Sequence, residues 1–212
     1  MNLDIQKASA AARAYAARQM GCAAEVFSQE GTFFVTNKDE EAPFIKLIAM
    51  GKSVVVSASP ELLPMVRGWM QGKSRDEIFE FPLVFGQTIH FIPDQKTFSA
   101  KPLVSGYSYH GLEEEDIKQL AGLQGCPNSL VFDGEGHTGT RMVFYAMKDG
   151  EVIGLAGAGQ EAEGLWEMGV DVEPAYQNQG LASVLVSHLA EKIMERGIVP
   201  FYSASVTNIG SQ

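Results

Sequence analysis

Apolar and polar residues alternate along the stretch that ends at Glu173-Pro174, and this alternation predicts a β-strand. Its apolar positions are Trp166, Met168, Val170 and Val172. After a short loop, apolar residues return at helical spacing from Leu181 to Ile193, which predicts an amphipathic helix. The sequence therefore predicts a strand, a loop and a helix in immediate succession.

Further strands are predicted on both sides of this succession. Arg141–Asp149, Glu151–Gln160 and Leu165–Val172 follow one another as antiparallel strands, because Asp149-Gly150 suits a tight hairpin turn. Pro200–Ser205 is also read as a strand, and the carboxylates in Leu112–Ile117 favour the N-terminus of a helix. These elements predict a mixed α/β (α+β) fold with a mostly antiparallel sheet.

The first half of the chain is read as a smaller α/β module. An amphipathic helix is predicted from Leu3 to Met20, and a second helix is expected to begin at Ser59-Pro60 and to end at Gly72. The predicted strands are Thr32–Thr36, Phe44–Met50, Ser53–Ser57, Ile78–Phe81 and Gln87–Ile92. The stretch from Pro93 to Ser105 is the best linker candidate, so we expect an N-terminal module at 1–105 and a second domain at 106–212.

Composition and charge narrow the class of protein. The chain has 212 residues, of which 45% are hydrophobic, so it can bury a core without a disulfide or a metal. The net charge of −10 argues against nucleic-acid binding, and no apolar stretch approaches the roughly 18 residues of a membrane span. The histidines lack metal-ligand spacing, so no metal is expected. Cys22 and Cys126 are read as reduced thiols, which favours a cytoplasmic location.

The loop before the predicted Leu181 helix has features of a phosphate-binding site. Gly180 can adopt a positive φ angle and bring the backbone close to a ligand. The small side chain of Ala182 leaves the first amide N–H groups of the helix open to an anion, which the helix dipole also attracts. The candidate phosphate-binding residues are Gln177, Asn178, Gln179, Gly180, Leu181 and Ala182.

The motif Gln177-x-x-Gly180-x-Ala182 resembles the acyl-coenzyme A signature of the GCN5-related N-acetyltransferase (GNAT) superfamily, which is Gln/Arg-x-x-Gly-x-Gly/Ala at the start of its main helix. The three predicted strands before the motif agree with the family. Tyr107–Gly111 resembles its first strand, Leu112–Ile117 its first helix, and Thr207–Ser211 its Asn-x-x-Ser element. The resemblance covers roughly residues 107–212. It implies a GNAT-like sheet flanked by helices and an acetyltransferase of bacterial type.

The resemblance also implies acetyl-coenzyme A (acetyl-CoA) as co-substrate, held between two parting strands, Leu165–Val172 and Pro200–Ser205. An amine of a small molecule or a peptide would attack the thioester carbonyl directly. The pyrophosphate would bind the amides of the signature loop, and the strand backbone would pair with the pantetheine arm. Outside the signature, the coenzyme-binding residues implied are Val170, Val172, Asn208 and Ser211.

The catalytic base is less clearly indicated by the resemblance. Many family members use a strand glutamate eleven residues before the signature glutamine, but that position is Trp166 here, and Glu167 lies one residue later. Because strand side chains alternate, this offset turns the Glu167 carboxylate to the opposite face unless a bulge restores it. The candidate catalytic residues are Glu167 and Asn208, and a solvent-facing glutamate is the alternative reading of Glu167.

The chain departs from the family at its C-terminal end, because the family continues beyond Asn-x-x-Ser with one helix and two strands. Truncation of a longer protein is the favoured explanation, and the alternatives are strands supplied by the first half or by a partner chain. The sequence also leaves open whether the chain forms a homo-oligomer. The sequence therefore leaves two main functions open, an N-acetyltransferase and a non-catalytic acyl-CoA-binding or sensing module. A third reading is an interaction protein that binds no coenzyme.

Overall fold

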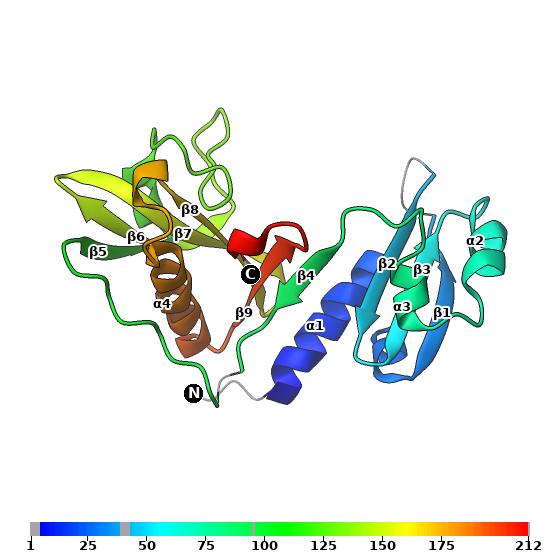
Figure 1. Ribbon diagram of the computed structural model, residues 1–212. Coiled ribbons are helices and arrows are strands. Elements are labelled where there is room, and N and C mark those ends of the chain that lie inside the picture. Colours follow the sequence, from blue (N-terminus) through cyan, green and yellow to red (C-terminus); the bar gives the residue numbers. More distant parts are fainter. Residues whose placement is uncertain (1–4, 39–42, 95, 212) are drawn as a thin grey trace. The chain divides into compact units, whose positions relative to one another are not determined.

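The computed structural model describes residues 5–38, 43–94 and 96–211, and the chain forms two compact units (Figure 1). One unit comprises Ser9–Gln87, and Thr88–Gln212 with the beginning of α1 (Ile5–Met20) belongs to the other. The division thus falls upstream of residue 105, where the sequence placed the boundary. None of the described helices is long and apolar enough to cross a membrane.

The smaller unit is a three-stranded sheet covered on both faces. Its central strand, β3 (Ser53–Ala58), pairs in parallel with β1 (Gly31–Thr36) and antiparallel with β2 (Ile45–Met50). The side chains of β3 are all buried, because α1 and the 3-10 helix η1 (Ala24–Ser28) pack on one face while other helices cover the opposite face. The N-terminal α/β module predicted from the sequence is present, and Leu3 of its first predicted helix lies outside the described residues.

Two predictions in this unit are wrong. Residues 78–81 do not form a strand, because residues 78 and 79 end α3 (Arg75–Phe79) and residues 80 and 81 follow the helix. This helix starts with a capping box in which the side chains of Ser74 and Glu77 bond each other's backbone N–H. Local capping therefore prevails over the short apolar run. The preceding helix, α2 (Leu63–Met70), begins later than Ser59-Pro60, and residues 59–62 form a turn before it.

The larger unit contains a six-stranded sheet in the order β4-β9-β8-β7-β6-β5. All neighbours are antiparallel except β8 and β9. The strands are β4 (Thr88–Phe91), β5 (Ser108–Glu113), β6 (Thr140–Lys148), β7 (Glu151–Ala162), β8 (Leu165–Val172) and β9 (Val199–Ser205). This mixed, mostly antiparallel sheet confirms the predicted fold class, and the three predicted hairpin strands are β6, β7 and β8.

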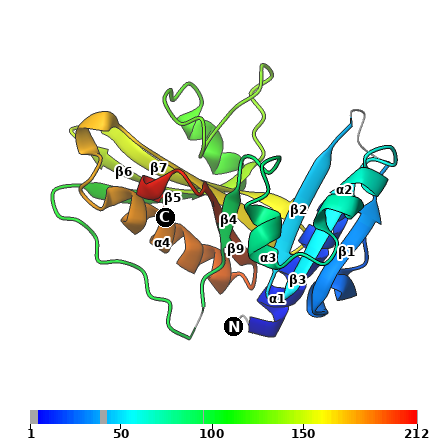
Figure 2. The same cartoon turned by 45° about the vertical axis from the view of Figure 1, so that its right-hand side comes forward.

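Helices cover the two faces of this sheet. The long helix α4 (Leu181–Glu195) packs on one face, as Figure 2 shows, and it buries Leu185, Leu189 and Ile193 at helical spacing. The 3-10 helix η2 (Glu114–Leu120) covers the other face together with the segment that follows it, around Ile117 and Leu130. Residues 112–117 were expected to be an α-helix, and they are instead the end of β5 and the start of η2.

Strand β4 belongs to the part of the chain that the sequence analysis assigned to the N-terminal module, residues 1–105. It pairs antiparallel with β9, so that Phe91 lies opposite Tyr202 and Thr88 opposite Ser205. The edge of β9 that faces away from β8 is therefore occupied by a strand that precedes residue 105. Strands supplied by the first half were one of the explanations left open by the sequence, and β4 is such a strand.

We expect Leu185→Ala to destabilise the larger unit by about 3 kcal/mol, because the leucine is fully buried between α4 and the sheet. Guanidinium unfolding followed by tryptophan fluorescence measures this effect. In a Trp69→Phe background the signal comes from Trp166, which is buried in the same core. Glu191→Ala, at an exposed position of α4, is the control and should change the free energy of unfolding by less than about 0.5 kcal/mol.

Candidate active site

The two parallel strands β8 and β9 part halfway along their length. Leu165–Met168 pair with Val199–Tyr202, and beyond these residues the described part of β8 pairs only with β7 and that of β9 only with β4. The backbone of Gly169–Val172 is thus open on the side of β9. These are the parting strands that the family resemblance implied.

The loop after β8 leads into α4 through backbone conformations that keep it open. Asn178 and Gly180 have positive φ angles of 60° and 79°. An added Cβ at Gly180 would meet nothing within 4 Å, and no side chain caps the N-terminus of α4. Because the first amides of a helix lack intrahelical partners, this end can accept an anion.

The predicted signature residues have different roles in this loop. The side-chain amide of Gln177 donates to the carbonyl oxygen of Val172 at 2.9 Å, and that of Gln179 donates to the carbonyl of Ala175 at 3.2 Å. Both side chains therefore fix the shape of the loop. The side chain of Leu181 is buried in the α4 core, so only its backbone is left for a ligand, and Asn178 and Gly180 are exposed.

A lysine and two tyrosines lie next to this loop. Tyr107 donates its hydroxyl hydrogen to Gln179 Oε1 at 3.0 Å. Lys148 Nζ lies 5.3 Å from the ring centroid of Tyr176 and 6.0 Å from that of Tyr107. The strongly acidic chain therefore has a positive charge close to the loop where an anion is expected, and the residues present fit a phosphate-containing ligand.

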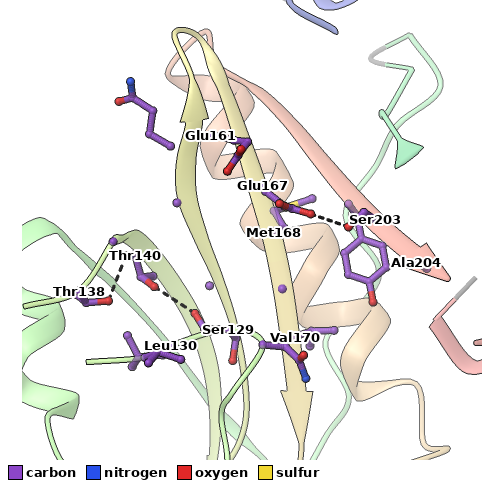
Figure 3. A pocket seen from close by; sticks show the side chains of 18 of the residues that line it. Ser129, Leu130, Thr138, Thr140, Glu161, Glu167, Met168, Val170, Ser203 and Ala204 are labelled. Atoms are coloured by element: carbon purple, nitrogen blue, oxygen red, sulfur yellow. Dashed lines mark hydrogen bonds between the residues drawn. The ribbon is translucent and has the colours of Figure 1, made fainter. Parts of the chain in front are cut away.

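A pocket of about 680 Å³ lies where β8 and β9 part (Figure 3). Four groups of residues line it: the segment 128–131, the segment 138–140, the middle of β7 and β8, and the end of β9 with Asn208. The predicted residues Glu167, Val170 and Asn208 line this pocket. The side chains of Val170 and Val172 both pack toward α4, Val172 is not among the pocket-lining residues, and Ser211 ends the 3-10 helix η4 (Ile209–Ser211).

The carboxylate of Glu167 lies on the pocket face of β8. Its neighbours in the strand, Trp166 and Met168, are buried against α4 on the opposite face. Ser203, the first residue of β9 beyond its pairing with β8, donates its hydroxyl hydrogen to Glu167 Oε1 at 2.5 Å (Figure 3). The sequence reasoning that Glu167 and Trp166 face opposite sides is correct, and the pocket is on the side of Glu167.

The sequence did not indicate the residues that form the other wall of the pocket. Asn128 and Ser129 lie across β7 and β8, and the carboxylate of Asp171 accepts hydrogen bonds from both. The signal that could have found this wall is a pair of glycines, Gly157 and Gly169, which lie opposite each other in the sheet. Gly157 lies in the glycine-rich stretch 154–159 and permits this close packing.

The side chain of His188, on α4, has a structural role. Its ring stacks on Phe144 at 5.2 Å, and its Nε2 lies 2.9 Å from the carbonyl oxygen of Lys101. Within residues 5–38, 43–94 and 96–211, no group of three His, Cys, Asp or Glu side chains could hold a metal ion.

Comparison with known proteins identifies the region of the chain that contains this site. The acetyltransferase (GNAT) family matches residues 110–212, from within β5 to the last residue of the sequence. No curated protein matches the chain.

Solved structures of acetyltransferases are similar to the chain at low sequence identity. A GCN5-related N-acetyltransferase-like protein from Streptococcus suis 89/1591 is 13% identical over 72% of this chain and 61% of its own, with a TM-score of 0.43. A GCN5-related N-acetyltransferase from Kribbella flavida is 13% identical over 56% of this chain and 48% of its own, with a TM-score of 0.42. The ribosomal-protein-S18-alanine N-acetyltransferase from Escherichia coli is 18% identical over 49% of this chain and 70% of its own, with a TM-score of 0.36. The chain thus spans less than two thirds of the first two structures.

We expect Cys126, two residues before the pocket wall formed by 128–131, to react slowly with iodoacetamide. Burial raises the pKa of its thiol, and the negative charge of Asp171 raises it further. Since the thiolate is the reactive form, the rate should be low below the raised pKa and should increase as the pH passes through it. A Cys22→Ser variant isolates Cys126, and the same variant unfolded in guanidinium chloride is the reference. Equal rates in the folded and unfolded states at mildly alkaline pH would contradict this expectation.

Proposed function

We propose that this protein transfers an acetyl group from acetyl-CoA to a primary amine of a small molecule or a peptide. The first ground for this proposal is that residues 110–212 match the acetyltransferase (GNAT) family. The observation that carries the proposal is the pocket at the parted strands, which contains a carboxylate of β8, the strand whose following loop leads to an uncapped helix N-terminus. Acetyl transfer in general follows from the family. The acceptor and the roles of individual residues are our proposal.

The residues assigned to acetyl-CoA lie in two places. The amides from Gln177 to Ala182, at the open N-terminus of α4, are assigned to the pyrophosphate. The open backbone of Val170 and Val172 and the side chain of Asn208 are assigned to the pantetheine arm and the thioester. When bound, the coenzyme supplies an acetyl group activated as a thioester.

The chemistry assigned to the pocket is a direct displacement. The amine nitrogen attacks the carbonyl carbon of the thioester, so that a C–N bond forms, the C–S bond breaks and the thiol leaves with a proton. The amide N–H of Val170 is the donor that we assign to the carbonyl oxygen as negative charge develops on it. Since an ammonium group has no free electron pair, a base must first accept its proton.

Glu167 is the residue that we assign as this base. Its Oε1 accepts the hydrogen bond from Ser203, which fixes the carboxylate between the two parted strands. Its Oε2 is the atom that we assign to the acceptor amine. A carboxylate in a pocket where Glu161 also lines the wall favours a cationic acceptor, which would arrive protonated.

One observation favours a non-catalytic acyl-CoA-binding or sensing module as the second candidate. The position where many relatives carry the catalytic glutamate holds Trp166, and its side chain is buried against α4. Such a module would bind acetyl-CoA and would release no thiol in the presence of amines. We further propose a cytoplasmic location, which the free cysteines Cys22 and Cys126 support.

Acetyl-CoA should stabilise the unmodified protein against heat, and Gly180→Glu should abolish the effect. At about 100 times the dissociation constant, binding adds about 2.7 kcal/mol, which raises Tm by about 5–10 °C. The glutamate places bulk and negative charge at the open helix N-terminus. Thermal unfolding with and without acetyl-CoA measures both effects.

Gly136→Glu is the matched control for that experiment. Gly136 is exposed, has the same φ of 79° as Gly180, and an added Cβ there would also meet nothing within 4 Å. The strain of the substitution is therefore matched, and the control should keep the full shift. An equal shift in the Gly180→Glu variant would place the coenzyme elsewhere, and no shift in the unmodified protein would reject the coenzyme site.

Glu167→Gln should lower the rate of acetyl transfer by about 100-fold or more, since a positioned base contributes that much to proton removal. Thiol release from acetyl-CoA is measured with three amines, namely a peptide with a free N-terminus, spermidine and an aminoglycoside. Glu163→Gln, an exposed residue of the β7–β8 hairpin, is the control and should keep the rate. Thermal shifts by acetyl-CoA should be the same in both variants. Full activity of Glu167→Gln would remove Glu167 from the mechanism.

A further inference from the structure

Two facing glycines support one wall of the pocket. Gly157 of β7 and Gly169 of β8 are cross-strand partners, and the segment 128–130 lies directly on them. A Cβ at Gly157 would come within 1.9 Å of the Ser129 carbonyl oxygen, and one at Gly169 within 1.8 Å of the Asn128 carbonyl oxygen. The segment can therefore lie against the sheet only because both positions lack a side chain.

Asp171 fixes the same segment through its carboxylate. Oδ2 accepts hydrogen bonds from the backbone N–H of Asn128 at 3.0 Å, the backbone N–H of Ser129 at 2.9 Å and the Ser129 hydroxyl at 2.6 Å. Oδ1 accepts from the Asn128 side-chain amide at 2.6 Å. Hydrogen bonds to an ionised carboxylate are among the stronger ones, so four of them on one segment hold it firmly.

The segment and the proposed base lie on the same face of the sheet. Glu167, Gly169 and Asp171 alternate along β8 and so share one face. Figure 3 shows Ser129 and Leu130 on one side of the pocket and Glu167 with Ser203 on the other. An amine that reaches Glu167 must therefore lie against the wall formed by residues 128–131.

We infer that Asp171 is a positioning residue that builds the acceptor side of the active site. This inference rests on the proposed function, because an acceptor side exists only if the pocket transfers an acetyl group to an amine. Asp171 touches neither reactant in this assignment. It holds the segment 128–130 in place, and the segment contacts the acceptor. Loss of the Asp171 carboxylate should weaken acceptor binding and leave acetyl-CoA binding unchanged, because the segment lies on a face of the sheet, whereas the coenzyme is assigned to the edge of β8 that faces β9 and to the N-terminus of α4.

The test compares Asp171→Asn with Asp133→Asn in the full chain. Asp133 is a matched control, since its carboxylate also accepts two backbone N–H groups, those of Glu135 and His137, in the adjacent exposed loop. In Asp171→Asn we expect the KM for the most active of the three amines to rise at least about tenfold, with the Kd of acetyl-CoA changed less than about twofold. Hydrogen exchange of the peptide that contains residues 128–130 should accelerate in Asp171→Asn and stay unchanged in Asp133→Asn.

Gly169→Ala is the second variant, because it displaces the same segment by steric overlap while Asp171 stays in place. It should raise the amine KM and accelerate exchange in the same way, which separates displacement of the segment from loss of charge. Unchanged amine KM in both variants, or an equal loss of acetyl-CoA affinity, would overturn the role of Asp171 and leave the proposed function standing. No thiol release by the unmodified protein with any of the three amines would overturn the acetyl transfer and the acceptor side together.

Discussion

The pairing of β8 with β9 stops after Met168 and Tyr202, and the whole candidate site depends on this interruption. Backbone N–H and C=O groups that leave a sheet ladder need other partners, because an unpaired polar group is costly once it is removed from water. β9 finds its partner in β4 along its other edge, whereas the end of β8 stays open on the side of β9. At that open edge an extended ligand can pair with the backbone in the interior of the sheet, and the loop that follows leads directly to the uncapped helix α4.

Because the side chains of β8 alternate, the strand serves two tasks with no conflict between them. Trp166, Met168 and Val170 attach it to α4, so the helix N-terminus is held close to the end of the strand. Glu167 and Asp171 project to the other face, where the pocket lies. A catalytic carboxylate at position 166 would face the helix core, where a charge is costly to bury. The glutamate one position later is therefore compatible with this fold.

Local patterns in the sequence predicted the strands and the helix that carry the site. The alternation around Trp166 and the helical spacing after Leu181 gave β8 and α4, because one-sided burial imposes these periods. Contacts between distant residues could not be read in this way. Asp171 binds a segment that precedes it by 42 residues, and no local pattern encodes that pairing. The pairing of β4 with β9 is equally long-range. The error at α3 was local, because the prediction gave the short apolar run at 78–81 more weight than the Ser74–Glu77 capping box.

The pairing of β4 with β9 also ties the first half of the chain to the site. Ser203 lies opposite His90 of β4 on one side and donates to Glu167 on the other, so its position depends on both neighbours. A fragment that begins at residue 106 would lack β4 and would leave the outer edge of β9 unpaired, and exposed edges of this kind associate with other chains. The region matched by the family is therefore not a self-sufficient unit in this protein, because the strand that pairs with the outer edge of β9 precedes it in the sequence.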